Sequence, residues 1–510
     1  IDRVDLYQNY LKVIDYKSSN KELNLELARL GFNMQMLIYL EMLSKNKNYD
    51  KGAVLYFNTK KRMIKSGIKK MGLFIAFGAI LGGVSAQNST GDTKEVQSEY
   101  AGFKTFRFGG YGEILANFMD YGVNRFSGIS YGSVRENRNS ISIPRFVLAF
   151  DYKFNPKWIL GAEIEFEAGG TGMAIELENS ENGEYETEVE KGGEVALEQF
   201  HITRLILPAF NVRVGHVIVP VGLTNTHHEP INFFGTSRPE GETSILPSTW
   251  HETGIEFYGT FGHRYSRFSY QALVVAGLNP NGFDRDTWVA GGKQGLFETD
   301  NFTSPAYVGR LNYEGVPGLR IGGSVYYCAD AARNADKKQT YSSIGDAQVR
   351  IFTGDAQYRN RYFIARGNVV YGNLENSAGI SAANGRLSNK SPYSRLTPIA
   401  KNAVSYAAEA GLNIQAFFNN KKKVPVIYPF ARYEYYNPQE KGEGGLTMDE
   451  RCQVSMWTAG LNWYPLPNLV VKADYTTRQI GTAKMFGSSS YNSENEFSIC
   501  IAYVGWFVKK

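Results

Sequence analysis

Residues 157–168 read KWILGAEIEFEA, and the alternation within this stretch is the clearest indication of the fold. Two sets of side chains take turns along it: Trp158, Leu160, Ala162, Ile164, Phe166 and Ala168 alternate with Ile159, Gly161, Glu163, Glu165 and Glu167. A period of two places these sets on opposite faces of a strand, one apolar and one acidic. The strand fits a soluble sandwich with its apolar face inward, or a membrane barrel with that face toward lipid. One strand leaves both open.

Repetition of this pattern favours the barrel. Strand-like segments are expected at residues 106–120, 141–154, 157–168, 194–207, 210–220, 249–261, 265–278, 305–314, 318–328, 347–358, 361–373, 403–418, 424–436, 452–464, 468–479 and 495–508. Their connections alternate between turns of at most five residues and loops of fifteen or more. Outer-membrane barrels alternate in this way, with short periplasmic turns and long external loops. We therefore predict an all-β chain: a 16-stranded antiparallel transmembrane β-barrel.

Residues 63–86 have the order of a secretory signal peptide. A basic flank comes first, with Lys65, Lys69 and Lys70. The apolar run 72–84 and the small residues Val84-Ser85-Ala86 follow. This order predicts export, with Met63 as the true start and cleavage after Ala86. The apolar run is too short to be a membrane-spanning helix, so any membrane role must come from strands.

The predicted leader divides the chain. We expect residues 1–62 to be a spurious or non-structural upstream segment, 63–86 a signal peptide, 87–102 a periplasmic N-terminal lead and 103–510 the outer-membrane β-barrel. The part after Ala86 holds 41 Lys and Arg against 43 Asp and Glu, so the net charge of +5 belongs to the leader and what precedes it. A basic surface for nucleic acid therefore has no support, and no nucleic-acid partner is expected.

The three cysteines, Cys328, Cys452 and Cys500, lie far apart and without CxxC spacing. Neither a disulfide framework nor a zinc site follows from this spacing, and no cofactor is expected. A closed barrel stabilises an exported chain by strand pairing instead.

Residues 212–223 (VRVGHVIVPVGL), 233–235 (FFG) and 248–255 (STWHETGI) run from a strand through a Gly/Pro bend and a long loop into a returning strand. With the closing hairpin around 470–475 and 502–503, they resemble the outer-membrane porins, and most closely the phosphate-selective porin O and P family in its Bacteroidetes form. The resemblance extends over residues 103–510 through loose motifs. It implies a 16-stranded barrel in the bacterial outer membrane, a homotrimer, and passage of small hydrophilic solutes or anions such as phosphate.

Alternation also predicts which charged side chains line the pore. They are Arg107, Glu113, Arg145, Asp151, Glu163, Glu165, Glu167, Arg213, Glu252, Arg320, Lys472, Asp474 and Arg478. A lumen of both signs creates a transverse field rather than an anion-attracting funnel. General passive diffusion is therefore the prediction, and phosphate or anion preference rests on the resemblance alone.

The loop 221–248 is the third long loop, the position from which general porins fold a loop inward. It carries His227, His228, Glu229, Arg238, Glu240 and Glu242. These side chains would form a constriction that screens solutes by size and charge. A solvated external loop is the alternative. Clustered histidines also fit a metal site, but adjacent side chains diverge in an extended chain, so no metal is predicted.

Two other classes remain open. Residues 128–132 match GxSxG, but the chemistry of that motif needs a strand-to-helix turn above a parallel sheet, which a loop between barrel strands does not supply. A barrel hydrolase built from separate strands remains an alternative, although we expect no enzyme. A barrel with a blocked lumen, acting as an adhesin or structural protein, would need a plug or an added domain. The acidic stretch 176–190 is either a solvated loop or a contact for cations or lipopolysaccharide; outer-membrane lipid and lipopolysaccharide are the expected surroundings.

Overall fold

The computed structural model describes residues 3–7, 10–17, 50–58, 99–121, 136–168, 175–179, 185–189, 195–294, 299–335, 338–387, 397–419, 424–481 and 492–510. The chain divides into two compact units, Ile1–Val84 and Ser85–Lys510. In the first unit, β1 (Arg3–Tyr7), β2 (Tyr10–Lys17) and β3 (Asp50–Asn58) form a three-stranded sheet in that order. The predicted signal peptide and the GxSxG stretch lie outside the described residues.

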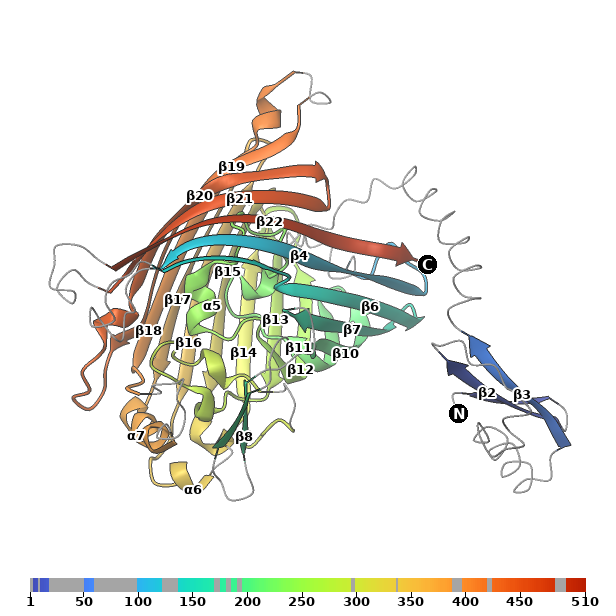
Figure 1. The fold of residues 1–510 in the computed structure, drawn as a ribbon, viewed down its shortest axis with the longest axis horizontal. Helices are drawn as coiled ribbons and strands as arrows, with labels where there is room; N and C mark the ends of the chain where they lie inside the picture. The colour runs from blue at the N-terminus through green and yellow to red at the C-terminus, as the bar shows by residue number, and fades with distance from the viewer. Residues whose placement is uncertain are drawn as a thin grey trace. The chain divides into compact units, whose positions relative to one another are not determined.

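The second unit is a closed barrel whose strands follow one another around the ring in sequence order (Figure 1). Its strands are β4 (Phe106–Tyr121), β5 (Glu136–Ser142), β6 (Arg145–Asn155), β7 (Trp158–Glu167), β10 (Val195–Leu207), β11 (Phe210–Ile218), β12 (His251–Phe261), β13 (Phe268–Val275), β14 (Ala306–Tyr313), β15 (Leu319–Cys328), β16 (Val349–Arg359), β17 (Phe363–Leu374), β18 (Asn402–Leu412), β19 (Val426–Lys441), β20 (Val454–Leu466), β21 (Leu469–Ile480) and β22 (Asn492–Lys509). The ring closes where β22 pairs antiparallel with β4.

Two of these segments, β5 and β6, share one position in the ring. Both pair with β4, β5 beside its second half and β6 beside its first. Pro144 stands between them and has no N–H for the ladder, so the strand predicted at 141–154 is interrupted there and begins earlier, at Glu136. Among the described residues the barrel therefore has sixteen antiparallel strands, which confirms the predicted fold class.

Several strand ends differ from the sequence prediction by a few residues, and three of them show why. β18 ends at Leu412 instead of 418, because a 3-10 helix, η8 (Ile414–Phe417), makes the turn. β13 begins at Phe268, after the short η3 (Arg264–Ser266). β19 runs five residues further than predicted, to Lys441. In all three, local turn or ladder hydrogen bonds decide a boundary that alternation does not mark.

The two faces of the barrel wall have opposite character. On β14, Tyr307 and Leu311 are 52% and 49% exposed, whereas Arg310 and Asn312 are 4% and 8% exposed. Large apolar side chains face outward along the other strands too, as Ile114 and Phe352 do. An apolar outside and a polar inside suit a barrel surrounded by lipid. Among the described residues, no helix is both long and apolar enough to cross a membrane.

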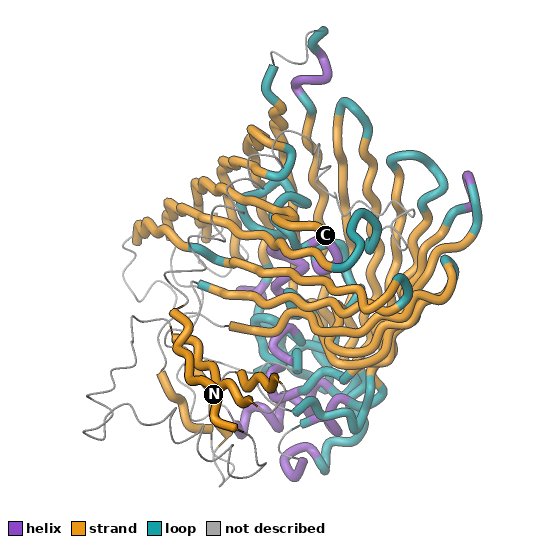
Figure 2. The backbone as a smooth tube through the Cα atoms, turned by 90° about the vertical axis from the view of Figure 1, so that its right-hand side faces the viewer, coloured by secondary structure: helices purple, strands orange, loops and turns teal. Residues whose placement is uncertain are grey.

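Most helices of the barrel unit gather with loops at one end of the strands (Figure 2). They include α6 (Lys338–Tyr341) and α7 (Ser377–Leu387), and the 3-10 helices η4 (Pro280–Gly282), η5 (Ala290–Gly292), η6 (Ala331–Asn334) and η10 (Glu450–Cys452). The helices η2 (Asn225–His227) and α5 (Glu240–Ile245) belong to the connection between β11 and β12, and α5 packs against β18 and β19 part-way along these strands. One apolar core joins these loops to the strand ends, with Trp250, Phe283, Trp288, Tyr326 and Ile380 buried in it. A separate hairpin, β8 (Ile175–Asn179) with β9 (Tyr185–Val189), forms within the acidic stretch.

Candidate functional site

The connection from β11 to β12 is folded back on itself at its base. Val219 donates its backbone N–H to the carbonyl of Trp250 at 2.9 Å. The Asn225 amide group donates to the carbonyls of Val219 and Trp250, at 2.6 and 3.1 Å, and accepts from the Trp250 N–H at 2.6 Å. This neck holds the two ends of the loop together, as in compact Ω-like loops. We call residues 219–250 the inner loop.

Glu242 on α5 fastens the two halves of the inner loop together. Its carboxylate accepts backbone N–H groups from Leu223, Thr224 and Asn225 at 3.1, 2.8 and 3.0 Å. Gly222 has φ +86°, and a Cβ there would lie 2.2 Å from Glu242 Oε1, so the close approach requires glycine. Burial raises the pKa of Glu242 to about 7, although the backbone hydrogen bonds oppose the shift.

The second half of the inner loop is bonded to β21. The Lys472 ammonium group donates to the carbonyls of Phe233 and Gly235, both at 2.8 Å. The Asp474 carboxylate accepts from the Thr236 N–H at 2.5 Å and from its hydroxyl at 3.1 Å. Two side chains of one strand therefore bind four polar groups within residues 233–236 of the loop.

Further contacts from β21 and from the nearby β19 strengthen this attachment. On β21, Arg478 forms an ion pair with Glu240 of the inner loop. On β19, the Glu434 carboxylate accepts the Gly241 N–H at 3.1 Å, and Arg432 donates to the Ser237 carbonyl at 3.2 Å.

The first half of the loop meets different strands. On β14, Arg310 donates to the Gly222 carbonyl at 3.1 Å, and on β6, Arg145 donates to the His228 carbonyl at 3.1 Å. The inner loop is thus bonded to β6, β14, β19 and β21, strands that lie around the whole ring. It therefore crosses the inside of the barrel.

The adjacent residues His227 and His228 occupy opposite electrostatic environments. His227 contacts Arg320 of β15, and burial together with Arg320 and Arg310 holds its pKa well below the usual range. His228 lies 3.1 Å from the Glu198 carboxylate of β10. Burial disfavours the charged imidazolium, but Glu198 outweighs it and raises the pKa of His228 to about 9. We call the surroundings of His227, where Arg310 and Arg320 share the Asp355 carboxylate, the basic side of the loop. The surroundings of His228, where Arg145 is paired with Glu113, are its acidic side.

Most of the predicted pore-lining residues are buried inside the barrel and paired there. The ion pairs are Arg107 with Asp151 at 2.5 Å, Arg145 with Glu113 at 3.1 Å, Arg213 with Glu256 at 3.0 Å, Arg320 with Asp355 at 3.6 Å, and Arg478 with Glu240 and Glu494. Glu163, Glu165 and Glu167 share the inward face of β7. Glu252 is fully buried and accepts from the Trp250 indole N–H at 3.1 Å.

The remaining predicted loop residues stay within the loop. Glu229 accepts from the Asn232 amide group at 2.7 Å, and Arg238 donates to the hydroxyls of Ser248 and Thr249 at 2.8 and 3.3 Å.

Sequence reasoning missed several interior charges. They are Glu198, Arg310, Asp355, Arg366, Glu409, Arg432 and Glu434. Alternation along the strands could have found most of them, since their neighbours in sequence point outward. Glu198 is the exception, because a register shift between Leu197 and Gln199 breaks the alternation of β10 at that residue.

The start of the described barrel unit also contacts the interior. Arg213 donates to Glu99 at 3.0 Å and to the Tyr100 hydroxyl at 3.1 Å. Lys153 donates to the Phe103 carbonyl at 2.8 Å. The end of the predicted lead is thereby fastened beside the first strands.

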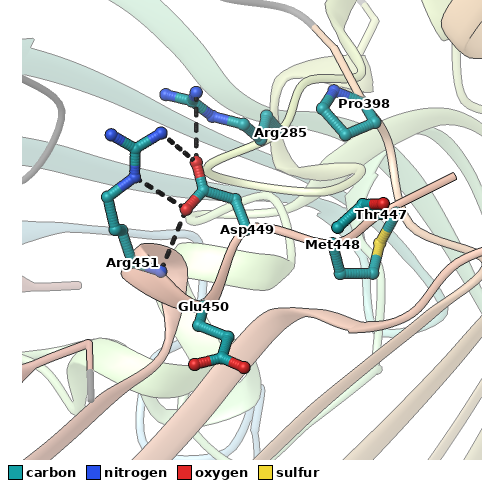
Figure 3. A pocket seen from close by; sticks show the side chains of 7 residues that line it. All are labelled: Arg285, Pro398, Thr447, Met448, Asp449, Glu450 and Arg451. Carbon is teal, nitrogen blue, oxygen red and sulfur yellow. Dashed lines mark hydrogen bonds and ion pairs between the residues drawn. The ribbon is translucent and has the colours of Figure 1, made fainter. Parts of the chain in front are cut away.

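A pocket of about 550 Å³ lies among the long loops (Figure 3). Asp449 lines it and pairs with Arg451 at 2.8 Å and with Arg285 at 3.4 Å. Burial opposes ionisation, but hydrogen bonds from Arg451 hold the pKa of Asp449 below its usual range. The two guanidinium groups are therefore engaged within the protein.

Different parts of the chain match different known proteins. Residues 1–107 match the PD-(D/E)XK nuclease superfamily. Over 75 residues the chain is 37% identical to an ATP-dependent helicase/deoxyribonuclease subunit of Clostridium acetobutylicum, which is 13% of this chain and 6% of that protein. The chain thus spans a small fraction of these relatives. Asp15-Tyr16-Lys17 at the end of β2 has the (D/E)XK spacing of the superfamily's name.

The longer match is to an uncharacterized protein of Aquifex aeolicus, 25% identical over 375 residues, covering 73% of this chain and 75% of that protein. Similar solved structures include OmpF of Salmonella typhi in complex with daunomycin (11% identity, TM-score 0.47, covering 78% of this chain and 97% of that one). An anion-selective porin from Comamonas acidovorans has 10% identity and a TM-score of 0.44, covering 79% of this chain and 100% of that one. The closed sixteen-stranded ring and its apolar exterior define the class of this unit: a β-barrel of the outer-membrane type.

Proposed function

We propose that the barrel is an outer-membrane porin that gives passive diffusion of small hydrophilic solutes or ions through a channel narrowed by the inner loop. The observation that carries this proposal is the loop's attachment to β6, β14, β19 and β21, which holds charged side chains across the inside of a barrel with an apolar exterior. Fixed polar groups across a lumen screen solutes by size and charge.

General diffusion is the selectivity we propose. Support comes from the two signs of charge on either side of the loop, with Arg310 and Arg320 on one side and Glu165 and Glu198 on the other. A field directed across the channel orients dipolar solutes and gives weak ion preference. The phosphate preference of the porin O and P family remains the alternative, because Arg310, Arg320 and Arg366 all lie near enough to lower the pKa of His227. Two carboxylates, Asp355 and Glu409, pair with these three arginines.

The surroundings follow from the same proposal. The barrel would lie in the bacterial outer membrane among lipid and lipopolysaccharide, as a homotrimer. It would perform no bond-making chemistry. The first unit would take no part in conduction, a view supported by its separation from Ser85–Lys510 and by its likeness to a short piece of a nuclease protein.

Single-channel recording in planar bilayers tests the proposal directly. The purified barrel should give stable open steps, a small reversal potential in a salt gradient, and little block of chloride current by added phosphate. Strong phosphate block would replace general diffusion with a phosphate-selective channel. A folded barrel that never conducts would contradict the channel and favour an adhesin or structural barrel.

A further inference from the structure

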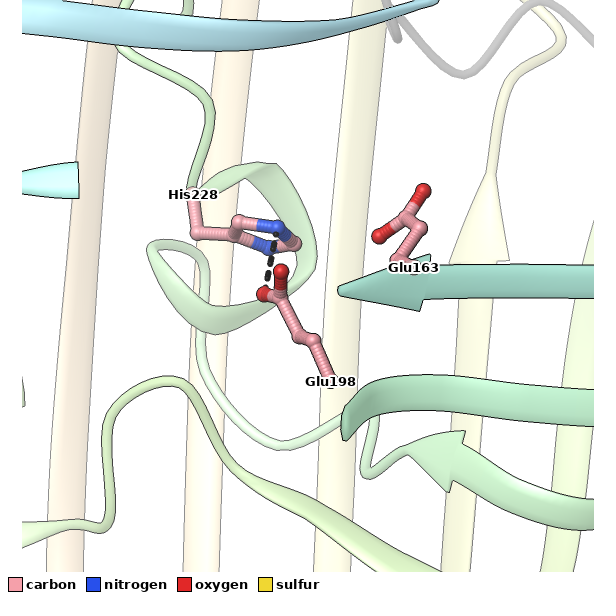
Figure 4. A group of neighbouring side chains, drawn as sticks. All are labelled: Glu163, Glu198 and His228. Carbon is pink, nitrogen blue, oxygen red and sulfur yellow. Dashed lines mark ion pairs between the residues drawn. The ribbon is translucent and has the colours of Figure 1, made fainter. Parts of the chain in front are cut away.

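Three side chains from three different segments converge on the acidic side of the inner loop (Figure 4). Glu163 belongs to β7, Glu198 to β10 and His228 to the inner loop just after η2. One ligand atom from each, a ring nitrogen of His228 and an oxygen of each carboxylate, lies within 4.8 Å of the other two. Glu198 is fully buried and His228 is 6% exposed.

Each of the three side chains also contacts a different uncharged group outside the cluster at hydrogen-bond distance. His228 Nδ1 lies 3.0 Å from the carbonyl of Asn225, so Nδ1 carries the hydrogen and Nε2 faces the carboxylates. Tyr111 donates its hydroxyl to Glu198 Oε2 at 3.2 Å. The Gln199 amide group donates to Glu163 Oε2 at 2.7 Å. Outer partners of this kind orient the ligands of protein metal sites.

The nitrogen that faces the carboxylates lacks a satisfactory partner of its own. His228 Nε2 is 3.1 Å from Glu198 Oε1, but it makes no hydrogen bond of acceptable angle to any residue that the structure describes. A buried nitrogen without such a bond is costly. A bound metal ion would displace the proton from Nε2 to solvent and satisfy this nitrogen together with both carboxylates. Arg145, a cation beside the cluster, is itself paired with Glu113 at 3.1 Å.

We propose that Glu163, Glu198 and His228 bind a divalent transition-metal ion, with Zn²⁺ as its best representative. One imidazole nitrogen and two carboxylates suit zinc-like ions better than Ca²⁺ or Mg²⁺, which prefer oxygen ligands throughout. Tetrahedral zinc holds such ligand atoms about 3.4 Å apart, so the group must contract on binding. Glu163, which is only half-buried, supplies that movement.

Such an ion would fasten the inner loop to the barrel wall. His228 comes from the loop and both carboxylates from the wall, so the metal would cross-link the two. The inference rests on how the loop meets the wall and not on conduction.

Zinc binding by the purified, chelator-treated barrel tests this proposal. Calorimetric titration with Zn²⁺ should give one ion per chain, and Co²⁺ should give a visible absorption band that Zn²⁺ removes. Replacing His228→Gln or Glu198→Gln should weaken zinc binding by at least about tenfold. Tyr111→Phe, which removes an outer partner, should weaken it by about 10- to 100-fold.

His263→Gln is the matched control, because this exposed histidine lies in a turn outside the barrel interior. It should leave zinc binding unchanged. Should a variant fail to form the heat-modifiable barrel on a gel, Glu163→Gln at the half-buried edge of the cluster replaces it. Wild-type barrel that folds but binds no zinc would overturn the site, as would binding that survives in His228→Gln and Glu163→Gln. Neither outcome depends on channel recordings, so the metal site and the channel can fail separately.

Discussion

At the residue scale, His227 and His228 show how strongly position in the fold determines chemistry. The two are adjacent in sequence, yet one contacts Arg320 and the other Glu198. Their pKa values are therefore shifted in opposite directions, His227 downward and His228 up to about 9. With no metal ion bound, burial and the arginines favour the neutral side chain of His227, whereas Glu198 favours the charged side chain of His228.

Glu242 gives the first prediction. Replacing Glu242→Ala leaves three backbone N–H groups without their acceptor, at about 1–3 kcal/mol for each group that stays buried. The inner loop should loosen, so single-channel conductance should rise and protease should cleave the loop faster. Glu242→Gln is the milder control, because its carbonyl oxygen can still accept from Thr224 and Asn225, which both bind Oε1. Unchanged conductance in the alanine variant would mean that the loop does not narrow the channel.

The pKa values of Glu242 and His228 predict how loop attachment varies with pH. Both pKa values are raised in the folded state, so both contributions are largest at low pH. That of Glu242 is lost as pH rises from 4.5 to about 7, and that of His228 from 6.5 to about 9. Hydrogen exchange of loop amides should therefore quicken in two steps as pH rises, after correction for intrinsic exchange. Glu242→Gln should remove the lower step and His228→Gln the upper one.

At the element scale, strand β7 places Glu163, Glu165 and Glu167 on one inward face. Changing all three to glutamine removes negative charge from the acidic side without altering shape. The ratio of cation to anion permeability should fall, by on the order of twofold or more. Reversal potentials in a salt gradient, measured with chelator present, provide the comparison. An unchanged potential would place this face away from the conduction path.

On the outward face of the strands, a change of charge should impair folding. Leu311 is 49% exposed near the middle of β14. Leu311→Arg places a charge against lipid and should cost about 2–4 kcal/mol if it lies near the bilayer midplane. Folding yield into vesicles, judged by heat-modifiability on gels, should drop, while Leu311→Ala should fold well. Normal folding of the arginine variant would show that this face does not meet lipid.

At the scale of the whole molecule, we expect the chain to be cleaved during export, so that the first unit is removed from the barrel. The barrel recovered from outer membranes should begin at Gln87, since the leader predicted at 63–86 ends in Val84-Ser85-Ala86. Mass spectrometry of the intact protein and of its N-terminal peptide measures this. Recovery of peptides from β1 to β3 in the membrane-embedded protein would instead keep the nuclease-like unit attached.

Alternation in the sequence was enough to predict the ring of strands, because a period of two is a local property that each segment displays without its neighbours. The order of the loops also singled out 221–248 as the one expected to turn inward; that it narrows a channel stays a prediction. Strand boundaries were harder to predict from alternation. They depend on backbone hydrogen bonds, which Pro144 cannot donate and which the turn at η8 redirects.

The contacts inside the barrel depend on the closed ring. Glu198 faces His228 because a bulge in β10 shifts the register at that residue, and Lys472 reaches the Phe233 carbonyl across 239 positions of sequence. Closure of the barrel brings such residues together, and the sequence around one of them does not predict its partner. Local alternation therefore determines which faces are apolar and polar, whereas the folded ring determines which polar groups meet.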